Sequence, residues 1–507
     1  MPRVVDGQKG VLHSGAPGLS LDLRQALDGW EKRDGSLHQR LAASLADAVE
    51  RGDLPAGIRL PPERVLAMEL GLARATVSAA YELLQRRGLV DRRQGRGTHV
   101  THGDTVGVDV RAAELATSLQ RNLLFRRLGE PSPGTIDLLG SSAPPSPAIR
   151  KALAQAAADV DIGELSLSHG YFPLGYPPLR EAVAAHLTAQ GAPTSAEEVL
   201  VTGGAQQGIS LCARSYAGHG SVVVMEDPTF PGAVDAFQTA GARILPIPVY
   251  ESGADVSLLE RTVAEHRVRA AYLMPTFHNP TGSVMPDQAR RELVRFARAA
   301  ELPIVEDNTL SELVLGTPPP PSLAAYSRNA SIVSVGSLSK VYWAGLRVGW
   351  VRAPRSTIVQ LGRLKAVADL GTSLPSQAMA VNLLARSEHV LALRRRELEA
   401  RTTLLEELLR RHMPEWTWRR PQGGLSLWVR LPEGSATELT QSAHRRGVSI
   451  APGSLMSITG RFDEFVRLSF DHEEAALEKG IRRLAAAWRT YRRALARTQS
   501  SRLHVVV

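Results

Sequence analysis

From residue 134 onward, the sequence alternates short runs of β-branched and other apolar residues with longer segments rich in Ala, Leu and Arg. The apolar runs lie in EEVLVTGG, SVVVMEDP, AAYLMPTF, LPIVEDN and SIVSVGSLSK, and each of them ends in a polar loop. Strands that alternate with helices in this way form an α/β fold with a mainly parallel sheet and helices on both faces. Such a sheet binds its ligands at the carboxyl ends of its strands, so we expect these loops to meet in one place.

The chain has 507 residues, more than one hydrophobic core usually supports, so we expect two or more domains. Its 43% hydrophobic and 22% charged residues are typical of a globular protein, and no apolar run approaches the roughly 20 residues that cross a bilayer. The first 20 residues contain no secretory signal, so we expect a cytoplasmic protein without a membrane segment. Cys212 is the only cysteine, which excludes an internal disulfide and a cysteine-built zinc site, and we predict no metal site.

The segment before residue 101 follows a different pattern. Apolar side chains at 37–49 recur at helical spacing, and a Gly and a Pro shortly afterwards end the helix. Residues 60–90 contain two further helical stretches, which a break at Gly71 separates. Residues 90–100 alternate around two glycines, as a two-stranded wing does. Three helices followed by a wing predict a winged helix-turn-helix.

Arginines gather in this N-terminal segment, and the net charge of +9 is compatible with an acidic partner such as DNA. In a helix-turn-helix the second helix enters the major groove with its first turn. That turn is ARATVS here, so Arg74, Thr76 and Ser78 are the candidates for reading a double-stranded DNA operator. Arg64 and Arg96, the latter at the tip of the wing, are candidates for holding phosphates. The alternative is a basic helical bundle with solvated arginines.

Lys340 is one of only six lysines in a chain that otherwise uses arginine as its cation, and it lies in SVGSLSKVYWAGLRVGW. An arginine keeps its proton near neutral pH, whereas a lysine amine can lose its proton and attack a carbonyl carbon. Lys340 is therefore a candidate nucleophile. On the lysine alone, a solvated surface side chain is the favoured alternative.

The other strand-end loops supply what an aldehyde cofactor with a pyridine ring, a phenolic oxygen and a phosphate requires. Lys340 would form the Schiff base, and Asp307 in VEDN would pair with the ring nitrogen and keep it protonated. Asn279 in NPTG would donate to the ring oxygen, and Phe230 in EDPTF would stack on the ring. Taken singly, Asp307 is also a possible helix cap, NPTG a turn and Phe230 a core residue.

A phosphate cradle completes this set. The segment TGGAQQ begins a helix, and the backbone N–H groups of Gly204, Ala205 and Gln206 would point at a bound phosphate. Ser337 and Arg347, on either side of Lys340, would complete the phosphate site.

Residues 134–490 resemble the fold-type I aminotransferases that depend on pyridoxal 5'-phosphate (PLP). The matching motifs are GYFPLGYPPLREAV, VTGGAQQ, EDPTF, HNPTG, VEDN, GSLSK with GLRVGW, and VRLSF. The resemblance implies PLP as cofactor, Lys340 as its internal aldimine lysine and a smaller C-terminal α/β subdomain. It also implies that Arg467 holds the α-carboxylate of a substrate or effector. Without the resemblance, a surface arginine at a strand edge would be the favoured reading of Arg467.

The segment GIRLPPERVLAMELGLARATVSAAYELLQRRGLVDRRQGRGTHV resembles the DNA-binding domain of GntR-type bacterial regulators. Two positions depart from that family. Ala73 stands where the family often has Ser, and Ser78 stands where an Arg often reaches DNA. The sequence of the operator half-site is therefore not implied by the resemblance.

A GntR-like module followed by an aminotransferase-like domain resembles the MocR regulators over nearly all of residues 37–490, and the segment around Lys340 is similar to a YczR-like branch. The expected domains are a flexible N-terminus (1–36), the winged helix-turn-helix (37–100), a linker (101–133), the PLP-binding domain (134–490) and a C-terminal tail (491–507). The resemblance implies a homodimer in which the winged helix of one protomer packs on the large domain of the other.

We therefore expect a transcriptional regulator that senses PLP, or an amino acid or amine through PLP. The alternative is a working aminotransferase with an accessory DNA-binding module; a cofactor-free scaffold is disfavoured by the complete Asp307 and Lys340 set. Two positions depart from the resemblance: Thr309 stands where many members have a Tyr that supports the ring oxygen, and Ala344 replaces the usual Pro before GLR. These departures favour formation of external aldimines over complete transamination. The sequence leaves the operator, the regulated genes, activation versus repression and the effector open.

Overall fold

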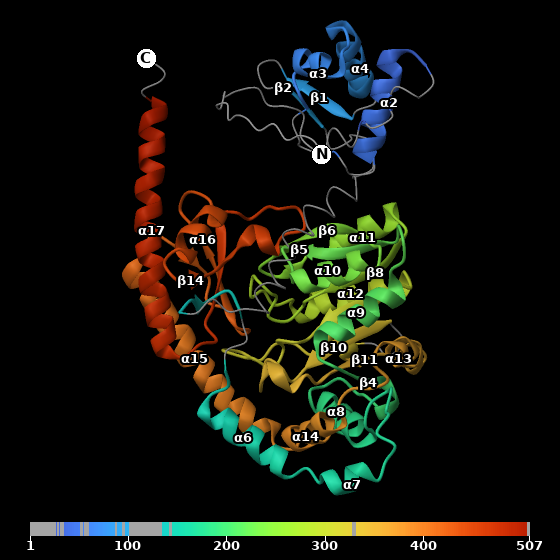
Figure 1. The fold of residues 1–507 in the computed structure, drawn as a ribbon. Coiled ribbons are helices and arrows are strands. Elements are labelled where there is room, and N and C mark those ends of the chain that lie inside the picture. The colour runs from blue at the N-terminus through green and yellow to red at the C-terminus, as the bar shows by residue number, and fades with distance from the viewer. Residues whose placement is uncertain are drawn as a thin grey trace, which may run out of the picture. The chain divides into compact units, whose positions relative to one another are not determined.

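The computed structural model describes residues 27, 30, 35–50, 54, 60–86, 89–93, 97–100, 134–140, 144–326 and 331–503. The chain divides into two compact units between Gly129 and Glu130 (Figure 1). No helix within the described residues is long and apolar enough to span a membrane. The expected linker at 101–133 and nearly all of the expected flexible N-terminus lie outside the described residues.

The first unit is a winged helix-turn-helix, as predicted. Its elements are α2 (Leu37–Glu50), α3 (Glu63–Leu70), α4 (Arg74–Arg86) and the antiparallel strands β1 (Val90–Arg93) and β2 (Gly97–Val100). Gly71 ends α3 with a φ of 63°, a left-handed conformation that glycine adopts without strain. Leu45, Leu66 and Tyr81, from the three helices, are fully buried in one core. The helical spacing of the apolar residues is what brings them to a common face.

The second unit is built on an eight-stranded sheet with the order β4-β11-β10-β9-β8-β5-β6-β7. The strands are β4 (Val199–Thr202), β5 (Val222–Asp227), β6 (Arg243–Tyr250), β7 (Gly253–Ala254), β8 (Val268–Leu273), β9 (Ile304–Asp307), β10 (Ile332–Ser337) and β11 (Gly349–Arg352). Neighbours from β10 through β6 are parallel, whereas β11 runs antiparallel to both β10 and β4. The mainly parallel sheet and its five expected strands are confirmed.

Helices cover both faces of this sheet. One face packs on α9 (Ala205–Tyr216), α10 (Pro231–Thr239) and α13 (Arg355–Asp369). The other packs on α8 (Pro177–Ala189), α11 (Val256–Glu265), α12 (Asp287–Ala299) and the short 3-10 helix η3 (Leu323–Ala325). Alternation along each strand sends successive side chains to opposite faces, so β9 places Val305 toward α9 and Ile304 toward α12.

A smaller C-terminal α/β part follows the long helix α15 (Ser387–His412), as the resemblance implied. Its four-stranded sheet has the order β12 (Thr417–Trp418), β13 (Ser426–Arg430), β16 (Phe465–Ser469) and β15 (Ala451–Pro452), and β3 (Ile136–Asp137) pairs with β14 (Val448–Ser449). Helix α17 (Glu474–Leu503) packs along α15 and α16 (Ala436–His444) (Figure 1). The remaining helices are α6 (Pro147–Ala158), α7 (Ile162–Ser166) and α14 (Leu374–Leu384), with 3-10 turns at η2 (Ala196–Glu198), η4 (Ala344–Leu346) and η5 (Gly453–Met456).

Candidate cofactor site and DNA-binding surface

Lys340 lies in the turn between β10 and η4. Strand β10 is buried along its whole length, and Val341 and Tyr342, which follow Lys340, are buried in the core. The lysine itself is half-buried, and Arg394 of α15 donates from Nη2 to its backbone carbonyl over 3.5 Å. Lys340 is therefore held at the carboxyl end of a central strand, and its half-buried position favours the candidate nucleophile over a solvated surface lysine.

Asp307 is the last residue of β9, paired in register with Val335 of β10, and is 3% exposed. Its two carboxylate oxygens are held by different donors: the Tyr272 hydroxyl donates to Oδ2 over 2.6 Å, and the backbone N–H of Thr309 donates to Oδ1 over 2.9 Å. No helix begins at Asp307, so the helix-cap alternative is wrong. Burial, and then the charge of Asp307, raise the pKa of the Tyr272 phenol well above its ordinary value of 10, so Tyr272 remains a donor.

Two further ionisable groups are fully buried next to Asp307. Burial raises the pKa of Glu226, on β5, to about 8, and the charge of Asp307 adds to this effect. Burial lowers the pKa of His278, whose Nε2 lies 3.5 Å from Glu226 Oε2, to about 3. Near pH 7 Glu226 is mostly protonated and His278 is neutral. The predicted site residues did not include Tyr272, Glu226 or His278; a polar side chain inside an otherwise apolar strand is the signal that marks the first two.

The segments proposed to hold a phosphate lie together. Gly204 is the N-cap of α9, with a φ of 99°, and a Cβ at this position would lie 3.0–3.1 Å from the guanidinium nitrogens of Arg347. Arg347 also donates from Nη2 to the carbonyl of Gly203. A Cβ on Gly349 would in turn meet the backbone of Gly204 at 2.8 Å, so both glycines are required for this close approach.

Ser337 ends β10 opposite Gly349 and is 4% exposed, and its Oγ donates to the Val348 carbonyl over 3.3 Å. The structure thus brings Ser337, Arg347 and the first turn of α9, with Ala205 and Gln206, to one corner. A helix N-terminus, an arginine and a serine hydroxyl form a suitable cradle for an anion such as phosphate.

Phe230 and Asn279 flank the same strand ends. Phe230 is half-buried at the N-cap of α10, and a Cβ on Gly232 would meet its ring at 2.5 Å. Gln206 donates from Nε2 to the Gly232 carbonyl over 2.8 Å, which ties this loop to the start of α9. Asn279 is half-buried, and its Oδ1 has no hydrogen-bond partner within the part of the chain that the structure describes. A buried amide oxygen without a protein partner fits a site that receives a polar ligand.

Arg467 lies on β16, which is bordered by β13 and β15, and is 8% exposed. Its Nη1 donates to the Leu139 carbonyl over 2.7 Å. The alternative of a surface arginine at a strand edge is therefore wrong, and a buried guanidinium is suited to recognising a carboxylate.

The predicted DNA contacts begin at α4. Arg74, its first residue, is 74% exposed in its side chain and donates from Nε to Glu63 over 3.3 Å. Ser78 donates to the other oxygen of Glu63 over 3.2 Å. Arg64 is exposed and Thr76 is half-buried, while the side chain of Arg96 lies outside the described residues. Glu63 thus accepts from two of the predicted DNA-contacting residues, and no pattern in the sequence indicates this shared partner.

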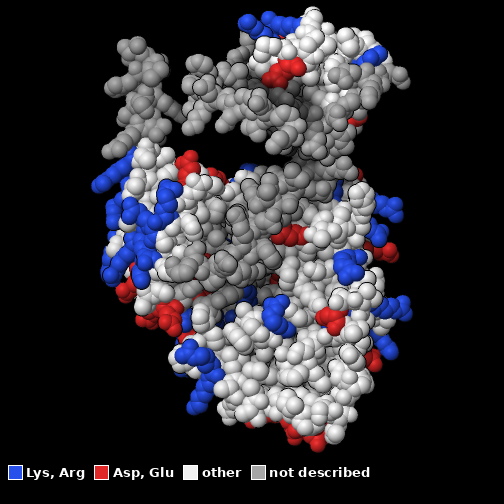
Figure 2. Space-filling model, in the orientation of Figure 1, with Lys and Arg blue, Asp and Glu red and all other residues white. Residues whose placement is uncertain are grey.

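Basic side chains also cover one face of the second unit, over α17 (Figure 2). Several of these arginines are bonded to their own chain: Arg483 donates to the carbonyls of Gly134 and Gly447, and Arg492 pairs with Glu415 and Glu433. These contacts within the chain favour a structural and solvated role of this helix over a role in DNA binding.

Comparisons with known proteins agree with both units. Residues 134–484 match the model of the aminotransferase class I and II family, and residues 37–100 match that of the bacterial regulatory proteins of the gntR family. The chain is 29% identical to the uncharacterized HTH-type transcriptional regulator YisV of Bacillus subtilis, over 90% of this chain and 98% of that protein. It is 34% identical to the 2-aminoadipate transaminase of Thermus thermophilus, over 70% of this chain and 90% of the enzyme.

Among solved structures, the second unit is similar to the α-aminoadipate aminotransferase LysN of Thermus thermophilus, complexed with N-(5'-phosphopyridoxyl)-L-leucine. That similarity has a TM-score of 0.67 and 32% identity, and covers 72% of this chain and 94% of LysN. It is also similar to the Pyrococcus horikoshii kynurenine aminotransferase, with a TM-score of 0.66 and 27% identity, over 73% of this chain and 94% of that one. The cofactor of this fold is PLP. The chain belongs to the class I and II aminotransferase family and, because a gntR-type DNA-binding domain precedes that fold, it is a transcriptional regulator with the MocR-type architecture.

Proposed function

We propose that this regulator holds PLP covalently at Lys340 and that an amino acid or amine controls its DNA binding through that cofactor. The observation that carries the proposal is the position of Asp307. Asp307 provides a carboxylate fixed by two donors at the end of β9, and the anion cradle of Arg347 and α9 lies across β10 near the ends of β11 and β4. These two features match the ring nitrogen and the phosphate of a pyridine cofactor.

Each predicted residue has a role in this arrangement. Asp307 would pair with the ring nitrogen, Asn279 would bind the ring oxygen and Phe230 would cover one ring face. Ser337 and Arg347, with the N–H groups at Gly204, Ala205 and Gln206, would bind the phosphate. When it is bound, PLP supplies an aldehyde that captures amines and a ring that withdraws electrons.

Arg467 would recognise the carboxylate of an effector that is an amino acid. A ligand can control DNA binding only if it binds two conformations with different affinity. Arg467 belongs to the C-terminal part, and its hydrogen bond to Leu139 ties that part to the segment before α6. An effector carboxylate at Arg467 would therefore favour one position of the C-terminal part over another.

The second candidate function is a working aminotransferase, which the similarity to the 2-aminoadipate transaminase favours. The presence of Thr309 disfavours rapid catalytic turnover. The threonine side chain is much shorter than the tyrosine expected there, so its hydroxyl reaches less far. Its Oγ1 is buried without a hydrogen-bond partner among the described residues. Repeated turnover with common amino acid and 2-oxo acid pairs would favour the enzyme.

We further propose that the protein acts in the cytoplasm as a homodimer, because paired winged helices suit two-fold symmetric operators. Large apolar side chains are exposed at Ile162, Leu167 and Tyr171 and again at Leu370, and the backbones of Phe172 and Gly371 lie close together. These residues are candidates for the dimer interface. The exchanged, head-to-tail arrangement remains a prediction, since the linker lies outside the described residues.

The test combines the cofactor and the operator. We expect the purified protein to absorb visible light when it binds PLP, borohydride to fix the cofactor on Lys340, and Lys340→Ala to abolish both. Operator affinity is measured by fluorescence anisotropy on the DNA upstream of the gene, with and without PLP and with candidate amines. Wild type should respond to a ligand and Lys340→Ala should not. A borohydride label on another lysine would contradict the assignment of the site.

A further inference from the structure

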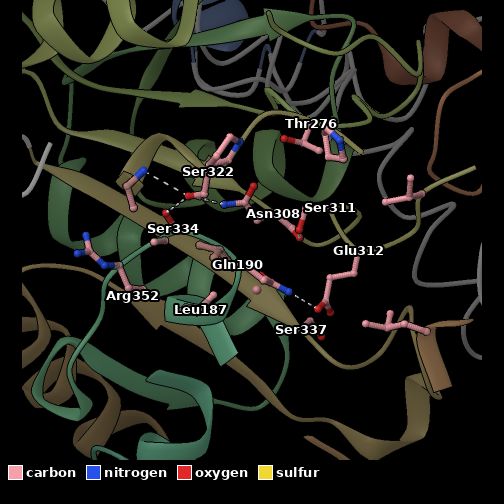
Figure 3. A pocket seen from close by; sticks show the side chains of 18 of the residues that line it. Leu187, Gln190, Thr276, Asn308, Ser311, Glu312, Ser322, Ser334, Ser337 and Arg352 are labelled. Carbon is pink, nitrogen blue, oxygen red and sulfur yellow. Dashed lines mark hydrogen bonds between the residues drawn. The ribbon is translucent and has the colours of Figure 1, made fainter. Parts of the chain in front are cut away.

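A second cavity, of about 640 Å³, lies in the second unit (Figure 3). Its floor lies on the opposite face of the sheet from Asp307. Alternation along β9 separates the two sites: Val305 and Asp307 point toward α9, whereas Glu306 points toward η3. The cavity is bounded by the end of α8, the ends of β9 and β10, the loop at 308–322 and the first half of α15. Its volume is typical of sites that bind small molecules.

The floor of this cavity is already hydrogen-bonded. Glu306 is fully buried and accepts from Ser322 Oγ at 2.7 Å, Ser334 Oγ at 2.6 Å and Leu323 N at 2.7 Å. Asn308 donates from Nδ2 to Ser322 over 3.3 Å. These hydrogen bonds hold the floor in place before a ligand binds. Asn308 Oδ1 is buried without a hydrogen-bond partner among the described residues, so the floor offers one free acceptor to a ligand donor.

The charged side walls are likewise engaged. Glu312 accepts from Gln190 and pairs with His186, both at 2.6 Å, and Arg352 pairs with Glu198 at 3.2 Å (Figure 3). The remaining wall is mainly apolar and consists of Leu187, Val314, Trp350, Leu391 and the prolines at 319–321. A bound molecule therefore meets an apolar surface over most of its body.

The α15 side of the cavity is lined by two arginines. Leu391, Ala392, Arg395 and Arg396 lie on one helical face toward the cavity. Arg395 donates from Nε to the Val314 carbonyl over 3.3 Å, and within the described residues neither arginine has an ion-pair partner. Glu388 is on the same face, but the helical rise places it about 10 Å from Arg395 along the axis. This end of the cavity is therefore positive, and it is complementary to an anionic head group.

We propose that this cavity binds a small carboxylate with an apolar body. The carboxylate lies at Arg395 and Arg396, and the body lies between Leu187, Val314 and the proline wall. Occupancy changes the PLP affinity of the other face, because Asn308 directly follows Asp307 in the chain and Ser337 of the phosphate cradle also lines this cavity. This coupling rests on the proposed function, whereas carboxylate binding does not.

The probes are 4-phenylbutyrate and 4-phenylbutyramide, which share an apolar body and differ in the charge of the head group; neither has an amine that could react with the PLP aldehyde. We expect titration calorimetry on the full-length, PLP-saturated protein to give affinity for the carboxylate about tenfold above that for the neutral amide. Ala392→Trp fills the cavity from an exposed helical position and should abolish binding. The double substitution Arg395→Gln and Arg396→Gln should remove the preference for the carboxylate. Arg411→Gln, on the same helix outside the cavity, is the matched control and should bind as wild type does.

Four results would overturn the binding site: no binding of 4-phenylbutyrate, equal affinity for the two probes, unchanged binding in Ala392→Trp, or competition between the carboxylate and PLP for one site. The coupling is measured as the PLP dissociation constant with and without saturating 4-phenylbutyrate. We expect a shift of about threefold or more in wild type and none in Ala392→Trp; an equal constant refutes the coupling. If the protein binds the carboxylate but never binds PLP, the proposed function is refuted and the carboxylate site is not.

Discussion

Tyr272→Phe is the sharpest test of how the candidate cofactor site is held, because it removes one oxygen atom and leaves the aromatic ring in place. The lost hydroxyl donates over 2.6 Å to Asp307 Oδ2, and both residues are buried. A hydrogen bond to a charged acceptor contributes about 1.5–3 kcal/mol to stability, against about 0.5–1.5 kcal/mol for a neutral pair. We therefore expect the cofactor-free variant to lose about 1.5–3 kcal/mol in its free energy of unfolding.

The matched control is Tyr342→Phe. Tyr342 is equally a buried tyrosine of the second unit, but its hydroxyl donates to a neutral acceptor, the Leu383 carbonyl, over 2.9 Å. Urea denaturation of the two cofactor-free variants, followed by far-UV circular dichroism, gives the comparison. The reasoning is refuted if Tyr272→Phe is no more destabilising than Tyr342→Phe, because Asp307 would then not depend on the phenol.

Three further outcomes are expected. Folding raises the pKa of Glu226 to about 8 from its ordinary 4.5, so the native state keeps a proton that the unfolded chain releases between these pH values. Wild-type stability therefore falls as pH rises through this window, and a pH series of urea midpoints should show a smaller fall for Glu226→Gln. Arg347→Gln should weaken PLP binding by about tenfold in a spectroscopic titration, with the exposed Arg363→Gln as control, since it removes a cation from the phosphate cradle. Arg74→Ala should weaken operator binding by about 1–3 kcal/mol in fluorescence anisotropy if Arg74 reads a base, and unchanged affinity would contradict its place in the groove.

The sequence was sufficient to predict the architecture of both units. Helical spacing in the first unit and buried strand runs in the second are local patterns, and local patterns specify local structure. The five strand-end loops were also expected to meet, because the carboxyl ends of parallel strands share one edge. That rule, together with the chemical groups that a pyridine cofactor with a phosphate requires, led to Asp307 and Ser337.

The hydrogen-bond partners of these residues could not be predicted from the sequence, because they depend on strand register and packing. Tyr272 is 35 positions before Asp307, and only the pairing of β8 with β9 brings them together. The second cavity depends on how α15 packs against the loop at 308–322, a contact between segments about 80 positions apart. Apolar spacing indicates which face of a helix is buried, but it does not indicate where packing leaves a space.

The hydrogen bonds that Glu63 accepts from Arg74 and Ser78 bear on how a protein of this kind would search DNA. If Arg74 and Ser78 contact DNA as predicted, each must first leave this carboxylate. On random DNA, we expect the exchange of Glu63 for a phosphate to gain little, so that Arg74 adds little to nonspecific affinity. At the operator, we expect a bidentate contact between Arg74 and a base to displace the carboxylate. Glu63 would then compete with DNA for Arg74 and increase discrimination between the operator and other DNA.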